Sequence, residues 1–289
     1  MKLSIGTAQF GANYGVANKT GKVAIRDIER IIALCRRNGI DTIDTAIAYG
    51  DSEKRLGDTG VADFRIVTKL PDYQAGAFTP EYWLQAQVEG SIERLRVPGL
   101  YGFLFHHPDQ LTSLSGEKLY KSLVTCKEMG LLQKIGVSIY SPDQLDHLMD
   151  NFDFDIVQAP FNIVDRRMLE SGLFAKLRRK LVEIHIRSVF LQGLLLMEPR
   201  ERHSYFQGWP ELWRTWHKLL SATGMTPLQA CLGFVHTVPE IDRIVVGVDS
   251  ASQLDQIIAS IPTGDFEYPE SLGLDDKNLV EPSSWPQFD

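Results

Sequence analysis

Residues 41–50 of the chain read Asp41-Thr42-Ile43-Asp44-Thr45-Ala46-Ile47-Ala48-Tyr49-Gly50. This stretch predicts a short buried strand at 42–44, a loop that carries Tyr49, and a charged helix over about 52–56. Asp44 at the strand end and Tyr49 five residues later place two ionisable groups where barrel enzymes carry their active sites. A lone pattern of this kind is more typical of a hydrogen-bonded Asp and a half-buried Tyr, so the rest of the chain decides between the two interpretations.

Strand-like and helix-like patterns alternate along the whole chain. The runs that we expect to be strands are 3–6, 42–44, 65–69, 100–105, 134–138, 156–159, 182–188 and 244–247. Helical periodicity predicts further helices at about 28–35, 80–95, 119–129, 145–149, 169–179, 228–235 and 254–258. With no break in composition, this order predicts one (β/α)8 barrel domain over residues 1–289 rather than an open doubly wound sheet. Residues 262–289 are expected to form an irregular C-terminal wrap.

Several helix starts carry local signals. Thr79-Pro80 combines an N-cap residue with proline at the first helical position. Residues 141–144 and 226–229 have the spacing of a capping box, and Ser250 precedes the last regular helix as an N-cap. These signals support the helical assignments of the segments that follow them.

The composition indicates a soluble, cytoplasmic globular protein. Of 289 residues, 44% are hydrophobic and 23% are charged, which suits a large core under an ordinary surface. The formal net charge of −7, without a compensating basic run, argues against a nucleic-acid partner. No apolar run approaches the ~20 residues of a membrane span, and the N-terminus looks like a strand rather than a leader.

The cysteine and histidine patterns do not indicate a disulfide framework or a metal site. Cys35, Cys126 and Cys231 lie far apart in helix-like apolar patterns, so we expect buried free thiols in a reducing compartment. The seven histidines lack metal-ligand spacing with a third partner, and no metal is predicted.

Four residues at predicted strand ends suggest a chemistry. A tyrosine near its usual pKa of ~10 transfers protons poorly at neutral pH, and a nearby ammonium such as Lys69 would lower that pKa. Asp44 could hold the lysine, while a neutral His106 could orient a carbonyl oxygen beside Tyr49. This set suits proton transfer to an oxygen. Because none of the four donates hydride, the interpretation implies a nicotinamide cofactor.

Several motifs occur in a characteristic order. They are residues 41–50, Val67-Thr68-Lys69, Phe103-Leu104-Phe105-His106-His107-Pro108, Gly136-Val137-Ser138, Val157-Gln158-Ala159-Pro160-Phe161-Asn162 and Gly193-Leu194-Leu195. Together they resemble the aldo-keto reductase family, over nearly the whole chain from Gly6 to about Ile258. The resemblance implies a (β/α)8 barrel that binds NADP(H) or NAD(H) in extended form, and no G-x-G-x-x-G fingerprint follows a strand here.

The resemblance also implies roles for individual residues. Tyr49 would be the general acid/base, Lys69 would lower its pKa, Asp44 would hold Lys69, and His106 would orient the substrate carbonyl. The implied cofactor-binding residues are Gly6, Thr7, Ser138, Gln158, Arg187, Ser188, Gln192, Gly193, Gly247, Asp249 and Gln253. In that set Ser138 and Gln158, at the ends of the fifth and sixth strands, would hold the nicotinamide carboxamide. Ser188 and the loop over residues 191–193 would face the pyrophosphate.

The sequence departs from the family pattern at several positions. Ile139 stands where Asn is common, Arg187 replaces the aromatic residue that stacks on the nicotinamide, and Gln256-Ile257 replaces the adenine-contacting pair. Asp249 stands where Lys, Arg or Ser often meets the 2′-phosphate of NADP. A carboxylate there would repel a phosphate and accept from a ribose hydroxyl, or it is simply a solvated acid beside a helix N-terminus. Preference between NADP(H) and NAD(H) therefore stays open.

The main hypothesis is an oxidoreductase that interconverts a small-molecule carbonyl and an alcohol. The loop over residues 6–18 resembles a bacterial branch linked to surface-polysaccharide sugar pathways, which favours a sugar-derived substrate. Two alternatives are a catalytically weak, cofactor-binding regulatory barrel and a redox-neutral sugar epimerase with retained cofactor. The aromatic residues at 205–216 either pack the fold or wall the substrate mouth. The exact substrate, the favoured direction and the oligomeric state do not follow from the sequence.

Overall fold

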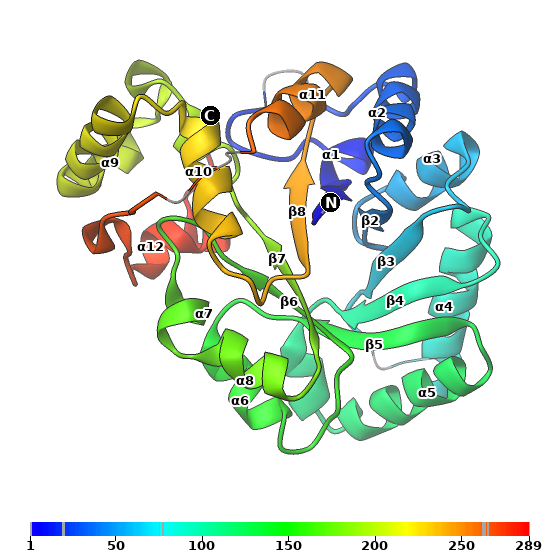
Figure 1. Cartoon of the computed structure of the whole chain (residues 1–289). Helices are drawn as coiled ribbons and strands as arrows, with labels where there is room; N and C mark the ends of the chain where they lie inside the picture. The colour runs from blue at the N-terminus through cyan, green and yellow to red at the C-terminus, as the bar shows by residue number, and fades with distance from the viewer. Residues whose placement is uncertain are drawn as a thin grey trace.

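Eight parallel strands close into a barrel in chain order (Figure 1). In this computed structural model they are β1 (Leu3–Gly6), β2 (Thr42–Asp44), β3 (Arg65–Leu70), β4 (Leu100–Phe105), β5 (Leu132–Ser138), β6 (Ile156–Pro160), β7 (Glu183–Arg187) and β8 (Arg243–Gly247). The structure describes residues 2–18, 21–74, 76, 78–261, 264 and 266–288. Strand β1 closes the barrel, with Gly6 level with Asp44 on β2 and with Gly247 on β8. The predicted (β/α)8 barrel is confirmed.

Helices surround the barrel wall (Figure 1). They are α1 (Ala8–Gly11), α2 (Ile25–Arg37), α3 (Ser52–Thr59), α4 (Pro80–Leu95), α5 (Gly116–Glu128), α6 (Pro142–Leu148), α7 (Arg167–Glu170), α8 (Leu173–Arg179), α9 (Pro210–Thr223), α10 (Pro227–His236), α11 (Ala251–Ala259) and α12 (Lys277–Val280). The predicted caps are present: Thr79 and Ser250 accept from backbone amides in the first turn, and both predicted capping boxes form.

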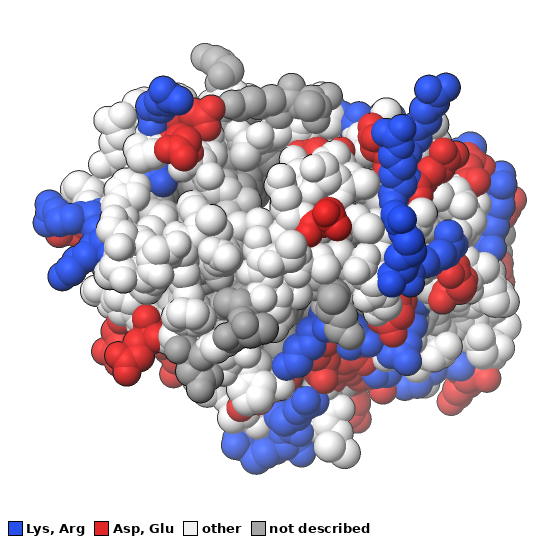
Figure 2. Space-filling model, turned by 45° about the horizontal axis from the view of Figure 1, so that its top comes forward, with Lys and Arg blue, Asp and Glu red and all other residues white. Residues whose placement is uncertain are grey.

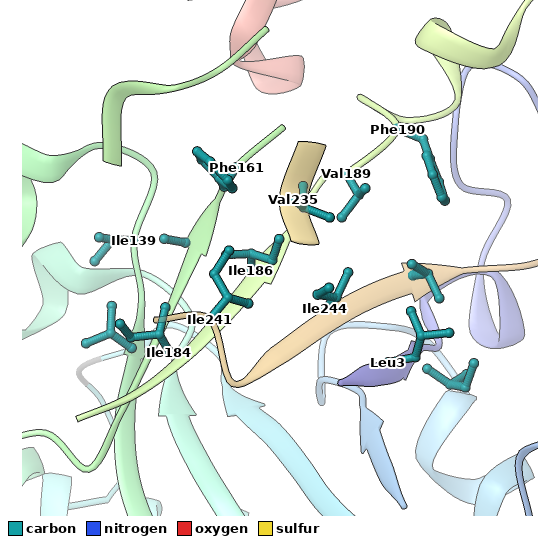
Figure 3. Packing of buried hydrophobic residues seen from close by; sticks show 14 of the residues in the cluster. Leu3, Ile139, Phe161, Ile184, Ile186, Val189, Phe190, Val235, Ile241 and Ile244 are labelled. Atoms are coloured by element: carbon teal, nitrogen blue, oxygen red, sulfur yellow. The ribbon is translucent and has the colours of Figure 1, made fainter. Parts of the chain in front are cut away.

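The apolar core has an outer and an inner part. The outer cluster joins the strands to the helices, and Figure 3 shows its region around β7 and β8, including Ile186, Val235 and Ile244. A separate small cluster consists of Val67, Leu104 and Ile156. Because these residues come from β3, β4 and β6, which are not all neighbours, we infer that they meet inside the barrel. Side chains alternate along a strand, so Lys69, two residues after Val67, projects into the same interior.

Glycines make room for this inner cluster. A Cβ atom added at Gly136 would lie 2.3 Å from Leu104 Cδ2 and 2.4 Å from the Ile156 carbonyl oxygen. A Cβ atom at Gly102 would lie 2.8 Å from Ile156 Cδ1. All three distances are shorter than any ordinary contact, so the absence of a side chain at these two positions permits the barrel interior to close.

Three local predictions differ from the structure. The helix predicted at 169–179 is divided into α7 and α8, because Gly172 adopts a φ of 71°, which ends a helix. The strand predicted at 182–188 is shorter, since Ser188 has a φ of 63° and leaves the extended conformation. Helix α9, of 14 residues, was not predicted as a helix.

The C-terminal segment is held by short helical turns. Between residues 266 and 288 the chain forms α12 and two 3-10 turns, and Leu272, Leu279 and Val280 are buried. The predicted wrap also included Pro262, Thr263, Asp265 and Asp289, which lie outside the described residues.

Charged side chains lie on the surface (Figure 2), and the three cysteine thiols lie inside the protein. On the face in Figure 2, basic and acidic side chains are interspersed along the right and lower margins around a largely uncharged centre. Cys35, Cys126 and Cys231 are buried and unbridged, as expected. Within the described ranges, no helix is both long enough and apolar enough to cross a bilayer.

Candidate active site

A buried ion pair lies at the carboxyl ends of β2 and β3. Lys69 Nζ donates to Asp44 Oδ1 at 2.6 Å and to the Thr45 carbonyl at 2.9 Å. Their side chains are 1% and 6% exposed. Burial lowers the pKa of Lys69, and the adjacent Asp44 carboxylate opposes that shift. The pair therefore places a positive charge deep in the barrel mouth together with its own counter-charge.

Tyr49 lies beside this pair. Lys69 Nζ is 5.2 Å from the centre of the phenol ring. Burial and then the charge of Asp44 raise the pKa of Tyr49, while Arg187 acts in the opposite direction. The sequence argument expected Lys69 to lower this pKa; in the structure the pKa is raised, because burial outweighs the opposing charge of Arg187. The phenol consequently holds its proton at neutral pH.

Two glycines fix the loop that carries Tyr49. A Cβ atom at Gly11 would lie 1.7 Å from the Tyr49 carbonyl oxygen, and one at Gly50 would lie 2.5 Å from the Gly11 carbonyl oxygen. Gly50 also has a φ of 57°, which favours glycine. The backbone of α1 thus packs directly against the tyrosine loop and sets where the phenol lies.

His106 completes the predicted group of four. Its ring centre is 5.8 Å from that of Tyr49, edge-on at 81°. Burial, with the positive charge of Lys69 as the next cause, lowers the pKa of His106 to about 3. The imidazole is therefore neutral at physiological pH, as the sequence argument required. Asp44, Tyr49, Lys69 and His106 are brought together in the structure.

An aromatic series continues from His106 around the mouth. His106 and His107 stack with ring centres 5.0 Å apart, and His107 and Tyr140 with centres 6.2 Å apart. The Arg187 guanidinium lies 4.6 Å from the centre of the Tyr140 ring. Sequence reasoning missed Tyr140, because only its position just after the fifth strand marks it.

Two predicted nicotinamide ligands end neighbouring strands. Ser138 on β5 is level with Gln158 on β6, and both side chains are buried. Gln158 Nε2 donates to Asp44 Oδ2 at 2.7 Å, which couples this residue to the ion pair. Its carbonyl oxygen, Oε1, has no hydrogen-bond partner among the described residues. The amide therefore retains an acceptor for a ligand.

The loop after β7 has an unusual backbone. Ser188, Leu191 and Gln192 have φ values of 63°, 48° and 53°, a region that side chains rarely adopt. Asn162 Nδ2 donates to the Ser188 carbonyl at 3.0 Å and holds the loop's start. Strained backbone of this kind concentrates at functional sites. This loop, which was expected to face the pyrophosphate, therefore has a backbone conformation that contacts with the rest of the chain must hold in place.

The loop after β1 covers the loop after β7. A Cβ atom at Gly193, which has a φ of 89°, would lie 2.6 Å from Ala17 Cβ. The Tyr14 hydroxyl and the Gln192 side chain form a hydrogen bond. Tyr14 is therefore part of a contact between two loops.

A third part of the candidate cofactor site follows β8. Gly247 has no side chain, and a Cβ atom there would meet the Gln9 amide at 2.6 Å. The Asp249 amide donates to Gln253 Oε1 at 2.7 Å. Asp249 Oδ1 is buried without a partner in the described chain, and burial raises the pKa of this carboxyl. An unpaired buried carboxylate oxygen is unusual and fits a ligand that donates a hydrogen bond.

The Thr7 side chain and the aromatic residues at 205–216 make contacts within the protein. The Thr7 hydroxyl donates to the Asp44 carbonyl at 3.0 Å and accepts from Ser52 at 2.9 Å, so its side chain is already engaged. The aromatic residues at 205–216 pack on the C-terminal segment: Phe206 lies 4.8 Å from the Trp285 ring and Trp209 Nε1 donates to Asp276. Of the two interpretations of these aromatic residues, packing within the fold is therefore the one that describes them.

Two cavities open at the amino ends of the strands, at the opposite end from Lys69. One of about 410 Å³ lies beside β5, β6 and β7, and one of about 310 Å³ is lined by residues of β3, β4, β5, β7 and β8. Lys134 pairs there with Glu183, and Arg178 pairs with Asp242. Among the residues that the structure describes, no group of His, Cys, Asp and Glu suits a metal ion.

Known proteins share this chain's sequence pattern and fold. The sequence profile of the aldo/keto reductase family matches residues 2–270. L-galactose dehydrogenase of Arabidopsis thaliana is 25% identical over 299 residues, covering 96% of this chain and 90% of that protein. An aldo-keto reductase of Mycobacterium sp. (strain KMS) is 31% identical over 130 residues, or 43% of this chain and 45% of that protein. The holo structure of an aldo-keto reductase from Bacillus halodurans, 16% identical, shares the fold with a TM-score of 0.73, over 98% of this chain and 95% of that one.

Proposed function

This chain belongs to the aldo/keto reductase family and is an oxidoreductase, and we propose that its barrel mouth interconverts a carbonyl and an alcohol through Tyr49. The observation that carries this proposal is the buried Asp44–Lys69 pair beside Tyr49, with a neutral His106 edge-on to the same phenol. Each of these side chains comes from a strand end or the loop after it, so the barrel itself sets their geometry.

Tyr49 is the proposed proton donor and acceptor. A bound nicotinamide supplies or accepts the hydride at the carbonyl carbon. Because burial raises its pKa, the Tyr49 phenol carries its proton at neutral pH, which is the state that reduction requires. The Lys69 ammonium then favours the phenolate that forms as the proton leaves.

His106 is the proposed orienting group. A neutral imidazole can donate one hydrogen bond to the carbonyl oxygen without adding a charge at the site. Its ring lies edge-on to that of Tyr49 with centres 5.8 Å apart, close enough for both groups to reach one substrate oxygen. Two converging donors fix the oxygen and help to polarise the carbonyl.

The donor set around the mouth suits a nicotinamide dinucleotide, and we infer that NAD(H) is preferred. Ser138 and Gln158 would hold the carboxamide, and the loop from Ser188 to Gly193 would face the pyrophosphate. Asp249 has a buried, unpaired oxygen that would accept from a ribose hydroxyl. The same carboxylate would repel the additional phosphate of NADP(H).

A sugar-derived carbonyl is the proposed substrate class. The loop over residues 6–18 resembles a branch linked to sugar pathways, and the plant relative is named for its action on L-galactose. Tyr14, Tyr49 and Tyr140 supply hydroxyl groups around the mouth, which suits a substrate with several hydroxyls.

The test combines binding and turnover. NADH and NADPH are titrated by fluorescence into cofactor-free wild-type protein, Tyr49→Phe and the exposed control Tyr82→Phe, and each protein is then assayed with a panel of aldehydes and aldoses. We expect unchanged cofactor binding in Tyr49→Phe with turnover reduced by about 10²–10⁴-fold. Turnover that survives in Tyr49→Phe would overturn the proposal. Cofactor binding without any turnover by the wild type would favour a regulatory barrel instead, and cofactor retained through dialysis would favour an epimerase.

A further inference from the structure

Arg187 is a cation at the barrel mouth without a carboxylate partner among the described residues. The other cations nearby are compensated: Lys69 pairs with Asp44, and Arg167 pairs with Asp165. In the described part of the chain the Arg187 guanidinium donates to two neutral oxygens, and Asp165, which pairs with Arg167, lies within its electrostatic reach. Arg202 also has neutral partners, but only Arg187 of the two lies at the mouth, where an anionic ligand could supply the partner that a partly buried charge normally has.

The guanidinium extends toward the residues that follow β5. Arg187 Nη2 donates to the Ile139 carbonyl at 3.0 Å, and the group lies over the Tyr140 ring at 4.6 Å. Both contacts turn it away from Gly247 and Asp249, which follow β8. Although Arg187 ends β7, its guanidinium therefore lies at the wall formed by the ends of β4 and β5, where His106 and Tyr140 lie.

That wall connects Arg187 to the groups proposed for the chemistry. From Tyr140 the rings continue through His107 and His106 to Tyr49, with successive centres 6.2, 5.0 and 5.8 Å apart. Arg187 also lowers the pKa of both Tyr49 and His106, which places it within electrostatic reach of them. One small molecule could contact the phenol and the guanidinium together.

From this placement, and on the basis of the proposed function, we infer that the substrate is a carbonyl compound bearing a carboxylate that Arg187 binds. The guanidinium presents planar donors that match a carboxylate. Lys69 pairs with Asp44 and Arg167 pairs with Asp165, so among the described residues Arg187 is the cation at the mouth without an ion-pair partner, which suits a monoanion better than a phosphate dianion. The net charge of −7 further disfavours a doubly charged ligand.

Matched aldehydes test this inference. The pairs are 4-oxobutanoate with 4-oxobutanamide and 4-formylbenzoate with 4-formylbenzamide, which differ only in the charge of one terminal group. The proteins are wild type, Arg187→Met, Arg187→Lys and the control Arg202→Met. Arg202 resembles Arg187 in its contacts, since it lies 3.8 Å over the Trp213 ring and donates to a backbone carbonyl.

We expect the wild type to favour the acid of each pair in kcat/KM. Arg187→Met should lower the acid-to-amide ratio by about 10- to 100-fold, the range of a hydrogen bond to a charged group. Arg187→Lys should keep part of the preference, because it retains charge but loses the planar fork. Arg202→Met should leave the ratio unchanged. A wild-type ratio near one, or the same ratio in Arg187→Met, would overturn the inference.

A second readout separates this inference from the proposed function and from cofactor binding. Calorimetry measures 4-hydroxybutanoate and 4-hydroxybutanamide binding to the protein–NADH complex, in which no reaction follows. Tighter binding of the acid that disappears in Arg187→Met supports the inference even without turnover. If Arg187→Met instead weakens NADH binding and leaves acid binding intact, the guanidinium serves a cofactor phosphate and the inference is wrong.

Discussion

Gln158 and Lys69 hold the two carboxylate oxygens of Asp44, one each. Gln158 Nε2 donates to Oδ2 at 2.7 Å and Lys69 Nζ donates to Oδ1 at 2.6 Å. The carboxylate from β2 thus positions both the ammonium beside Tyr49 and the amide proposed to bind the nicotinamide. A change at this one residue should disturb stability, proton transfer and cofactor binding together.

Asp44→Asn should destabilise the protein strongly. It leaves the Lys69 ammonium buried without a counter-charge, which typically costs about 3–5 kcal/mol of unfolding free energy. Asp41→Asn is the control, because Asp41 is 46% exposed and its ion pairs are 3.5 and 3.7 Å long, so its loss should be about 1 kcal/mol or less. Urea denaturation measures both, and similar losses in the two variants would contradict the prediction. Asp44→Asn combined with Lys69→Met should recover part of the stability.

His106→Gln should make stability less sensitive to acid. The pKa of His106 falls from its usual 6.5 to about 3 in the folded protein. Between these values the unfolded chain binds a proton that the folded chain excludes. The contribution of His106 to the free energy of unfolding is therefore fully present above pH 6.5. As the pH falls from 6.5 toward 3, protonation of the unfolded chain lowers the free energy of unfolding by up to about 1.4 kcal/mol per pH unit.

The comparison uses urea denaturation at neutral pH and at about pH 4.5. Wild-type protein should lose more unfolding free energy across this interval than His106→Gln does. Parallel losses would show that this imidazole gains no proton on unfolding and would count against its neutral, buried state.

Asp249→Ser should shift cofactor preference toward NADPH. Removing the half-buried carboxylate removes the repulsion of the 2′-phosphate, and we expect the ratio of NADPH to NADH affinity to rise by about tenfold. Gln253 should keep its bond, because it accepts from the backbone amide of Asp249. Fluorescence titration gives both affinities, with the exposed Asp255→Ser as the control. An unchanged ratio would mean that Asp249 is only a solvated acid at the start of α11.

Gly136→Ala should destabilise the inner cluster. The added methyl would overlap Leu104 and the Ile156 backbone, at 2.3 and 2.4 Å, and the backbone cannot move aside cheaply. Overpacking of this kind costs about 1–3 kcal/mol. Gly208→Ala meets nothing within 4 Å and should change stability by about 0.5 kcal/mol or less. Thermal unfolding of both variants checks the difference.

Local signals were enough for much of the architecture. Three helix starts are each marked by a signal of four residues or fewer, namely Thr79-Pro80 and the capping boxes at 141–144 and 226–229. The structure contains all three helix starts. The Asp44–Lys69 pair could be predicted because β2 and β3 are neighbours and both residues lie near their carboxyl ends. Patterns confined to one element, or to adjacent elements, are visible in a sequence.

Features that depend on how the barrel closes were not predictable in this way. The Gln158–Asp44 bond spans 114 residues and joins strands that are not neighbours, so it depends on the width of the closed barrel. Tyr140 meets Arg187 because of the path that the chain takes after β5, which has no local signature. By contrast, two differences had a local signal: Gly172 lies inside the predicted helix, and Pro210 is the first residue of α9.

The contact between Gly11 and the tyrosine loop restricts how this protein can be redesigned. Any side chain at Gly11 would occupy the position of the Tyr49 carbonyl, and any at Gly50 would displace Gly11 in turn. A mutant library aimed at new substrates would therefore lose its active members wherever it varied these two glycines. Diversity belongs at Tyr14 and Tyr140, where the mouth can change shape while the phenol stays in place.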